Sequence, residues 1–165
     1  GNPPADTLPI SFALMLNLAS AASAHNTDVM WGFIGRYCDG ASPATHPMLD
    51  QLAGFAVKYF QDFVEPTKSF RAADDRECAA MQDLIERLEA LGPDCRDGEV
   101  IQNEVYAAGK AAEYENLRDW FKALYEVLLG QSQGPRFGSF VAIYGIPETV
   151  ALIEKGLAGD LLAEK

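Results

Sequence analysis

Apolar residues recur every three or four positions along most of this chain, which is the spacing of one face of an α-helix. The clearest stretch runs from Pro47 to Glu65 and ends at Pro66. Its apolar members are Leu49, Leu52, Phe55, Ala56, Tyr59, Phe60, Phe63 and Val64. No segment alternates apolar and polar residues as a half-buried strand would. The pattern therefore predicts an all-α fold in which these apolar faces form the core.

Capping residues, glycines and prolines divide the pattern into seven or eight helices. The first four expected helices are Ile10–Ala24 with Ser11 as its cap, a second through Cys38 capped by Asn26 or Thr27, a third over 47–65, and a fourth opened by Asp74 and Asp75 and ended by Gly92-Pro93. The others are a fifth capped by Asp97, Leu117–Leu129 capped by Asn116, a short helix that starts at Pro135, and 147–162. Helices of such unequal length predict an irregular bundle.

The first nine residues differ from the rest, because three prolines lie between Asn2 and Pro9. We expect residues 1–9 to form an extended linker from an absent upstream domain. Residues 10–165 are then one helical region, since a chain of 165 residues is long enough to bury a core of its own.

The net charge of -11 argues against a general nucleic-acid binder and against a DNA partner, whose usual signature is a basic surface. The acidic residues are unevenly distributed, however. Residues 74–94 hold seven acids and two bases, whereas residues 117–145 hold three bases and two acids. A local contact with RNA is therefore compatible with the second of these stretches.

Three cysteines without a Cys-x-x-Cys pair predict neither a zinc site nor a disulfide framework, and a reducing cytoplasm is expected. No apolar run has the length of a membrane span, and no signal peptide is recognisable. Lys68 and Arg71 form a small basic cluster after Pro66, to which the sequence assigns no role.

The motifs of common catalytic sites are missing: there is no Walker loop, no Gly-x-Gly-x-x-Gly and no His-Glu-x-x-His. His25 and His46 are interpreted as turn histidines. A hydrolase or transferase would need one of them beside Cys95 or a carboxylate in a closed pocket. We therefore expect this chain alone to be inactive as an enzyme and to bind no metal or cofactor.

The candidate site is the loop Gln131-Ser132-Gln133-Gly134 and the helix that follows it. With Pro135 in the first helical position, Arg136 lies in the first turn, beside backbone N–H groups that lack helical partners. Gly134 and Gly138 are expected to leave this backbone approachable. The arrangement suits a phosphate or a base edge.

Other members of the candidate site are Phe137, Ser139, and the cations Arg118 and Lys122, four residues apart on one helix. Phe137 is open to two interpretations, as a face on which a base stacks or as a core residue. Arg118 and Lys122 have a simpler alternative as solvated surface charges. The other aromatic residues of this region are expected to pack in the core: Trp120, Phe121 and Phe140.

The order of these elements resembles the C-terminal region of class I lysyl-tRNA synthetases. The resemblance extends over nearly the whole chain from about Leu8. It is carried by the apolar helix that contains Leu8-Pro9-Ile10-Ser11-Phe12, by Trp31-Gly32, by Tyr59-Phe60-Gln61-Asp62-Phe63-Val64, by Leu124-Tyr125-Glu126-Val127-Leu128-Leu129-Gly130 and, most specifically, by Gly134-Pro135-Arg136-Phe137-Gly138. The last fifty residues are also similar in layout to the end of glutamyl-tRNA synthetases, where such helices contact the anticodon loop.

The resemblance implies an α-helical anticodon-binding region whose partners are lysine tRNA and the Rossmann catalytic domain of the same protein. Neither the His-Ile-Gly-His-like nor the Lys-Met-Ser-Lys-Ser-like motif of that domain occurs here. The parent enzyme would use ATP, magnesium and lysine, and would act in the cytoplasm. The alternative is an acidic helical module for protein–protein interaction, in which a groove seats an amphipathic helix.

Overall fold

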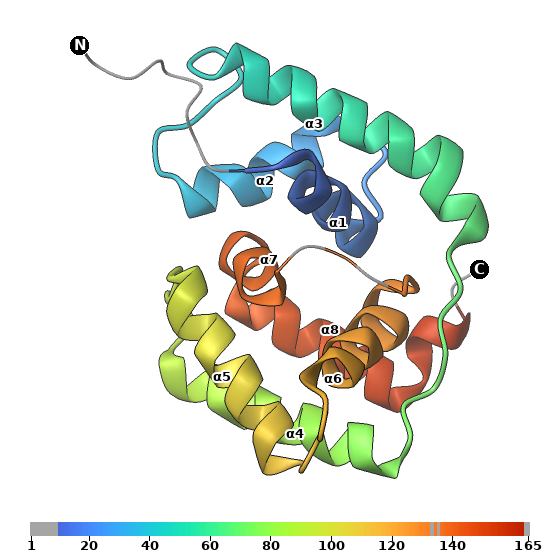
Figure 1. Ribbon diagram of the computed structural model, residues 1–165. Coiled ribbons are helices and arrows are strands. Elements are labelled where there is room, and N and C mark those ends of the chain that lie inside the picture. The colour runs from blue at the N-terminus through green and yellow to red at the C-terminus, as the bar shows by residue number, and fades with distance from the viewer. Residues whose placement is uncertain (1–9, 133, 135, 164–165) are drawn as a thin grey trace. The chain divides into compact units, whose positions relative to one another are not determined.

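The computed structural model describes residues 10–132, 134 and 136–163, and within these ranges it contains eight α-helices and no strand. The helices are α1 (Phe12–Ala22), α2 (Thr27–Tyr37), α3 (Pro47–Tyr59), α4 (Asp75–Leu91), α5 (Gly98–Ala111), α6 (Leu117–Leu124), α7 (Phe137–Tyr144) and α8 (Ile146–Ala158) (Figure 1). The predicted all-α fold is confirmed.

The chain divides into two compact units at the boundary between Thr67 and Lys68, within the range that the sequence led us to treat as one region. In the first unit, α3 packs against both α1 and α2. The predicted caps are present: the Ser11 side chain accepts from the Leu14 N–H at 3.1 Å, and Asn26 caps α2 in the same way.

The second unit is built around α5, which packs against α4, α6 and α7, while α8 packs against α4 and α7. Residue Gly109 of α5 makes room for Trp120, because a Cβ there would lie 2.5 Å from the indole ring. The indole N–H of Trp120 donates to the Val105 carbonyl at 2.9 Å. The largest fully buried side chains of the second unit are Trp120, Phe137, Phe140, Met81, Leu84, Leu88 and Ile101.

Two helices end in a π-helical turn where the sequence predicts continuous α-helix. Segment η1 (Phe60–Val64) extends α3, and segment η3 (Tyr125–Leu129) extends α6. A π turn changes the hydrogen-bond partner by one residue and leaves little trace in a pattern of apolar residues.

The predicted buried stripe on α3 is partly wrong. Leu49, Ala56, Phe60 and Val64 are buried, but Phe55, Tyr59 and Phe63 are exposed. The apolar face of this helix is wider than the surface that α1 and α2 cover, and the periodicity alone does not show where the cover ends.

No single described helix is long and apolar enough to cross a membrane. The consecutive helices α7 and α8 are long and apolar enough only when they are taken together, and the chain bends by 113° between them.

Candidate nucleic-acid interface

The candidate loop leaves η3 at Gly130, which adopts a left-handed conformation with φ of 69°. After this turn, the Gln131 N–H donates to the Tyr125 carbonyl at 3.2 Å. Ser132 is exposed and Gln131 is half-buried, so the first residue of the loop is only partly open to solvent. Two residues of the predicted site region, Gln133 and Pro135, lie outside the described residues.

Arg136 is the N-cap residue of α7, and its side chain is exposed and makes no capping hydrogen bond. The helix starts at Phe137, two residues later than predicted from Pro135. The guanidinium group of Arg136 is therefore displayed at the end of the loop and does not belong to the first helical turn.

The prediction that Gly138 leaves the backbone of α7 approachable is wrong. Its N–H donates to the side-chain carbonyl of Gln102 at 2.6 Å, and this bond is buried. A Cβ on Gly138 would lie 2.5 Å from the Gly98 carbonyl oxygen and 2.7 Å from the Gln102 nitrogen. The glycine thus allows α7 to approach α5 closely, and Gln102 occupies one of the N–H groups that an anion would need.

Phe137 is part of the core. It is fully buried, and its ring lies 6.0 Å from that of Tyr125 and 5.7 Å from that of Phe140. This arrangement supports the core interpretation and leaves no face of the ring for a base to stack on. Ser139, two positions further along α7, is half-buried, and its Cα would be 3.5 Å from a Cβ on Gly98.

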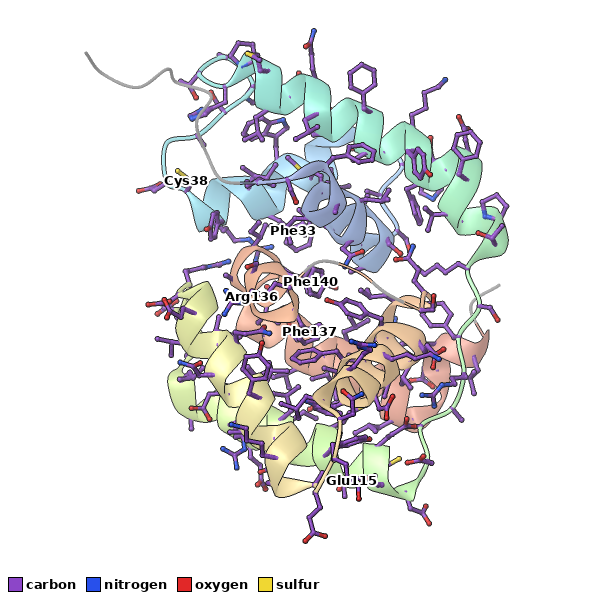
Figure 2. All side chains as sticks on the ribbon, in the orientation of Figure 1. Phe33, Cys38, Glu115, Arg136, Phe137 and Phe140 are labelled. Carbon is purple, nitrogen blue, oxygen red and sulfur yellow. The ribbon has the colours of Figure 1, made fainter. Side chains whose placement is uncertain are left out.

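The cationic pair of α6 lies apart from the loop. Arg118 and Lys122 are both exposed. At a rise of about 1.5 Å per residue, they lie roughly 18 Å and 12 Å from Gly130 along the helix axis. In Figure 2, Glu115, which lies two residues before α6, and Arg136 are at opposite ends of the second unit. The structure therefore does not combine this pair with Arg136 into one surface.

A residue to which the sequence assigned no role, Lys68, lies beside the loop instead. The N–H of Ser69 donates to the Gly130 carbonyl at 3.0 Å, and a Cβ on Gly130 would lie 2.7 Å from Cγ of Lys68. The ammonium group of Lys68 lies over the ring of Phe70, 4.9 Å from its centre. Because Lys68 and Gly130 are more than sixty residues apart, local sequence patterns do not predict that they lie together.

Arg71 fixes the segment that contains Lys68, Ser69 and Phe70. Its two terminal nitrogens donate to the Glu77 carboxylate at 2.7 and 2.8 Å, and its Nε donates to Glu126 at 2.9 Å. Glu77 also accepts the Asp74 N–H, in a capping box that begins α4. The hydrogen bond from Arg71 is the main reason that the pKa of Glu77 lies below its ordinary value. Arg71 therefore serves the packing of the second unit.

The described residues hold no group of three or more His, Cys, Asp and Glu side chains that could bind a metal ion. His25 contacts Gln61 and Glu65, and His46 contacts Thr45, all in loops and helix ends. The described part of the second unit also contains an open depression of about 390 Å³, whose lining residues are Glu89, Pro93, Ile146, Pro147 and Val150. That lining is mostly apolar and shares no residue with the loop.

Comparison with known proteins gives a consistent set of relatives. The chain is 51% identical to a lysine–tRNA ligase of Roseobacter denitrificans over 165 residues, which is 99% of this chain and 31% of that protein. It is 45% identical to the lysine–tRNA ligase of Rickettsia felis and 46% identical to that of Rickettsia bellii, over 92% and 94% of this chain. These alignments cover 29% and 30% of the two proteins.

No family model and no solved structure matches the chain. The chain spans about a third of the length of the curated relatives that it matches, and the alignment takes in nearly all of its own residues. Identity of 41–51% over 152 to 165 residues indicates shared descent. The chain is therefore homologous to one region, about a third, of the lysine–tRNA ligases.

Proposed function

We propose that this chain is the tRNA-binding, anticodon-recognising C-terminal part of a class I lysine–tRNA ligase and serves the synthesis of lysyl-tRNA. The single observation that carries the proposal is the 51% identity to about a third of a lysine–tRNA ligase over 99% of the chain. Neither nucleotide-site motif of a class I catalytic domain occurs in the sequence, which favours a binding role for this third. ATP, magnesium and lysine are then ligands of the remainder of the parent enzyme.

The proposed RNA-contacting surface is the loop surface, which we define as Lys68, Gln131, Ser132 and Arg136. Anticodon bases are single-stranded, so their edges are open to hydrogen bonds from amide, hydroxyl and guanidinium groups. Gln131, Ser132 and Arg136 offer all three kinds of group within six residues. Lys68 adds a positive charge on the other side of Gly130. Gln133 and Ser139 remain predicted members of the same site.

Arg118 and Lys122 have a different role in this proposal. They are exposed and separate from the loop surface, and no described hydrogen bond orients either side chain. Flexible cations of this kind attract phosphates without reading a sequence. We assign them a contribution to affinity that is the same for every tRNA.

A binding titration tests the proposal. The chain is titrated with lysine tRNA and with a non-cognate tRNA at two salt concentrations. We expect tighter binding of the lysine tRNA and a shallow dependence on salt, equivalent to the neutralisation of about 2–4 phosphates. Equal affinity for both tRNAs, a footprint confined to the acceptor stem, or the absence of binding at low salt would each contradict the proposal.

A second experiment tests the assignment of chemistry to the absent part. Lysine-dependent exchange between ATP and pyrophosphate is measured on the purified chain, with the full-length ligase of Roseobacter denitrificans as the positive control. We expect no exchange above background, because the described part of the chain nowhere combines a nucleophile, a base and a nucleotide site. Exchange that survives repeated purification would show that this chain carries catalytic groups.

A further inference from the structure

The first unit exposes a row of aromatic side chains that the loop surface does not use. Phe55, Tyr59 and Phe63 follow one another at intervals of four residues along α3 and η1, and Phe12 of α1 lies beside them. We call these four residues the aromatic ridge. Their side chains are exposed by 66%, 43%, 62% and 37% in the order given.

Three rings of the ridge, those of Phe12, Tyr59 and Phe63, form a continuous surface. The rings of Phe12 and Tyr59 meet edge to face with centres 5.7 Å apart, and the centres of Tyr59 and Phe63 are 5.0 Å apart. Contiguous exposed apolar surface of this kind marks an interaction site.

The charges around the ridge disfavour RNA as its occupant. Single-stranded RNA stacks on aromatic rings where cations accompany the backbone. Here exposed Asp62 and Glu65 flank Phe63, and Lys58 is the one base between residues 47 and 67. Residues 10–67 as a whole hold five acids and two bases. The ridge therefore fits an apolar protein surface better than a polyanion.

The coverage of the relatives suggests a partner for the ridge. The lysine–tRNA ligases that match this chain share 29–31% of their length with it, so more than two thirds of each lies outside the match. We propose that the aromatic ridge packs against an apolar face of that remaining part in the assembled enzyme. This inference rests on the proposed function for its partner, and it assigns to the first unit a role in holding the enzyme together.

Hydroxyl-radical footprinting tests the proposal in a full-length protein. The protein is the Roseobacter denitrificans ligase with this chain in place of the 165 matching residues, compared with the isolated chain. We expect the ridge residues to react readily in the isolated chain and about tenfold less in the full-length protein, because the core of a packed interface excludes water. Phe121, a partly exposed aromatic residue of the second unit, is the internal control and should react alike in both.

Several outcomes would overturn the proposal. Equal reactivity of the ridge in both proteins would show that the remaining part of the enzyme does not cover it. Low reactivity already in the isolated chain would show that this chain covers its own ridge. Protection that appears only when lysine tRNA is added would assign the ridge to RNA. Since no tRNA is otherwise present, failure here is distinguishable from failure of the tRNA titration.

A second measurement does not depend on the folding of the full-length hybrid. Sedimentation velocity of the isolated chain is compared for the natural sequence and Phe55→Lys over a wide concentration range. We expect both to remain monomeric with the same melting temperature. A dimer that Phe55→Lys abolishes would identify a second copy as the occupant and would contradict the proposal.

Discussion

Two helices of this protein end in the same way and meet different surroundings. In the first unit, α3 passes into the π-helical segment η1, and its aromatic residues Tyr59 and Phe63 are exposed. In the second unit, α6 passes into η3, where Tyr125 and the three residues Val127–Leu129 are buried. Burial raises the pKa of the Tyr125 hydroxyl well above its ordinary value.

The difference shows that the same local pattern can build a core or display a surface. Segment η3 is covered because α8 packs against it and because Lys68 and Ser69 contact Gly130 at its end. Segment η1 contacts α1, whereas Phe55 and Phe63 are left mostly exposed by the described residues of the first unit. We infer that the second unit is stabilised by its own core, whereas the first keeps apolar surface for a partner.

The largest expected effect comes from truncating a buried ring of the second unit. Phe137→Ala should lower the free energy of unfolding of that unit by about 3–5 kcal/mol, because it leaves a cavity in the core. The matched change in the first unit, Phe63→Ala, should cost no more than about 1 kcal/mol, because its side chain is mostly exposed. Similar losses for the two variants would invalidate the comparison.

Tryptophan fluorescence separates the two units in this experiment, because Trp31 lies in the first unit and Trp120 in the second. Urea unfolding is followed in a Trp31→Phe background for the second unit and in a Trp120→Phe background for the first. Each truncation should shift the transition of its own unit.

A smaller effect is expected at Arg71, which joins the segment before α4 to η3. Arg71→Met should destabilise the second unit by about 1–3 kcal/mol, since it leaves the buried carboxylate of Glu77 without its cation. The value is discounted because the Arg71 side chain is 40% exposed. The control is Arg87→Met, which removes ion pairs with Asp83 and Glu104. Their carboxylates are 35% and 32% exposed, whereas Glu77 is 9% exposed, so this change should cost about 1 kcal/mol or less. Equal losses would mean that the Arg71 network adds nothing beyond a surface ion pair.

The same network predicts a dependence on pH. The folded-state pKa of Glu77 is lowered, so the unfolded chain takes up this proton first as the pH falls. The stabilisation is complete above the ordinary glutamate pKa of about 4.3 and is lost as the pH falls through the lower folded value. The loss caused by Arg71→Met should therefore shrink between neutral pH and about pH 3, as measured by urea unfolding at each pH. A loss that does not change with pH would exclude Glu77 as its source.

Much of the fold could be predicted from the sequence, because caps and apolar periods act locally. Ser11, Asn26, Asp74, Asp97 and Asn116 all cap the helices that they were expected to begin. The division into two units, the two π turns and the exposure of the ridge depend on tertiary cover, which periodicity does not record.

The candidate site was predicted less well, because its geometry depends on residues that are distant in sequence. Gln102 satisfies the Gly138 N–H from another helix, and Lys68 reaches Gly130 from the start of the second unit. One signal was available: Gln102 is a polar residue beside Ile101 on the inner side of its helix, and a buried polar side chain requires a partner. For Lys68, no local feature of the sequence predicts its contact with Gly130.

The most direct test of the central claim compares Arg136→Ala with Lys122→Ala in binding to lysine tRNA and a non-cognate tRNA. Both cations are exposed, but only Arg136 lies in the loop surface. We predict that Arg136→Ala weakens binding of lysine tRNA by about 1–3 kcal/mol, as expected for the loss of a bidentate base contact, and changes the free energy of unfolding by less than about 0.5 kcal/mol. Lys122→Ala should weaken both tRNAs equally and slightly. Equal losses for the two variants on both tRNAs, or early melting of Arg136→Ala with unchanged affinity of the folded fraction, would contradict recognition by this loop.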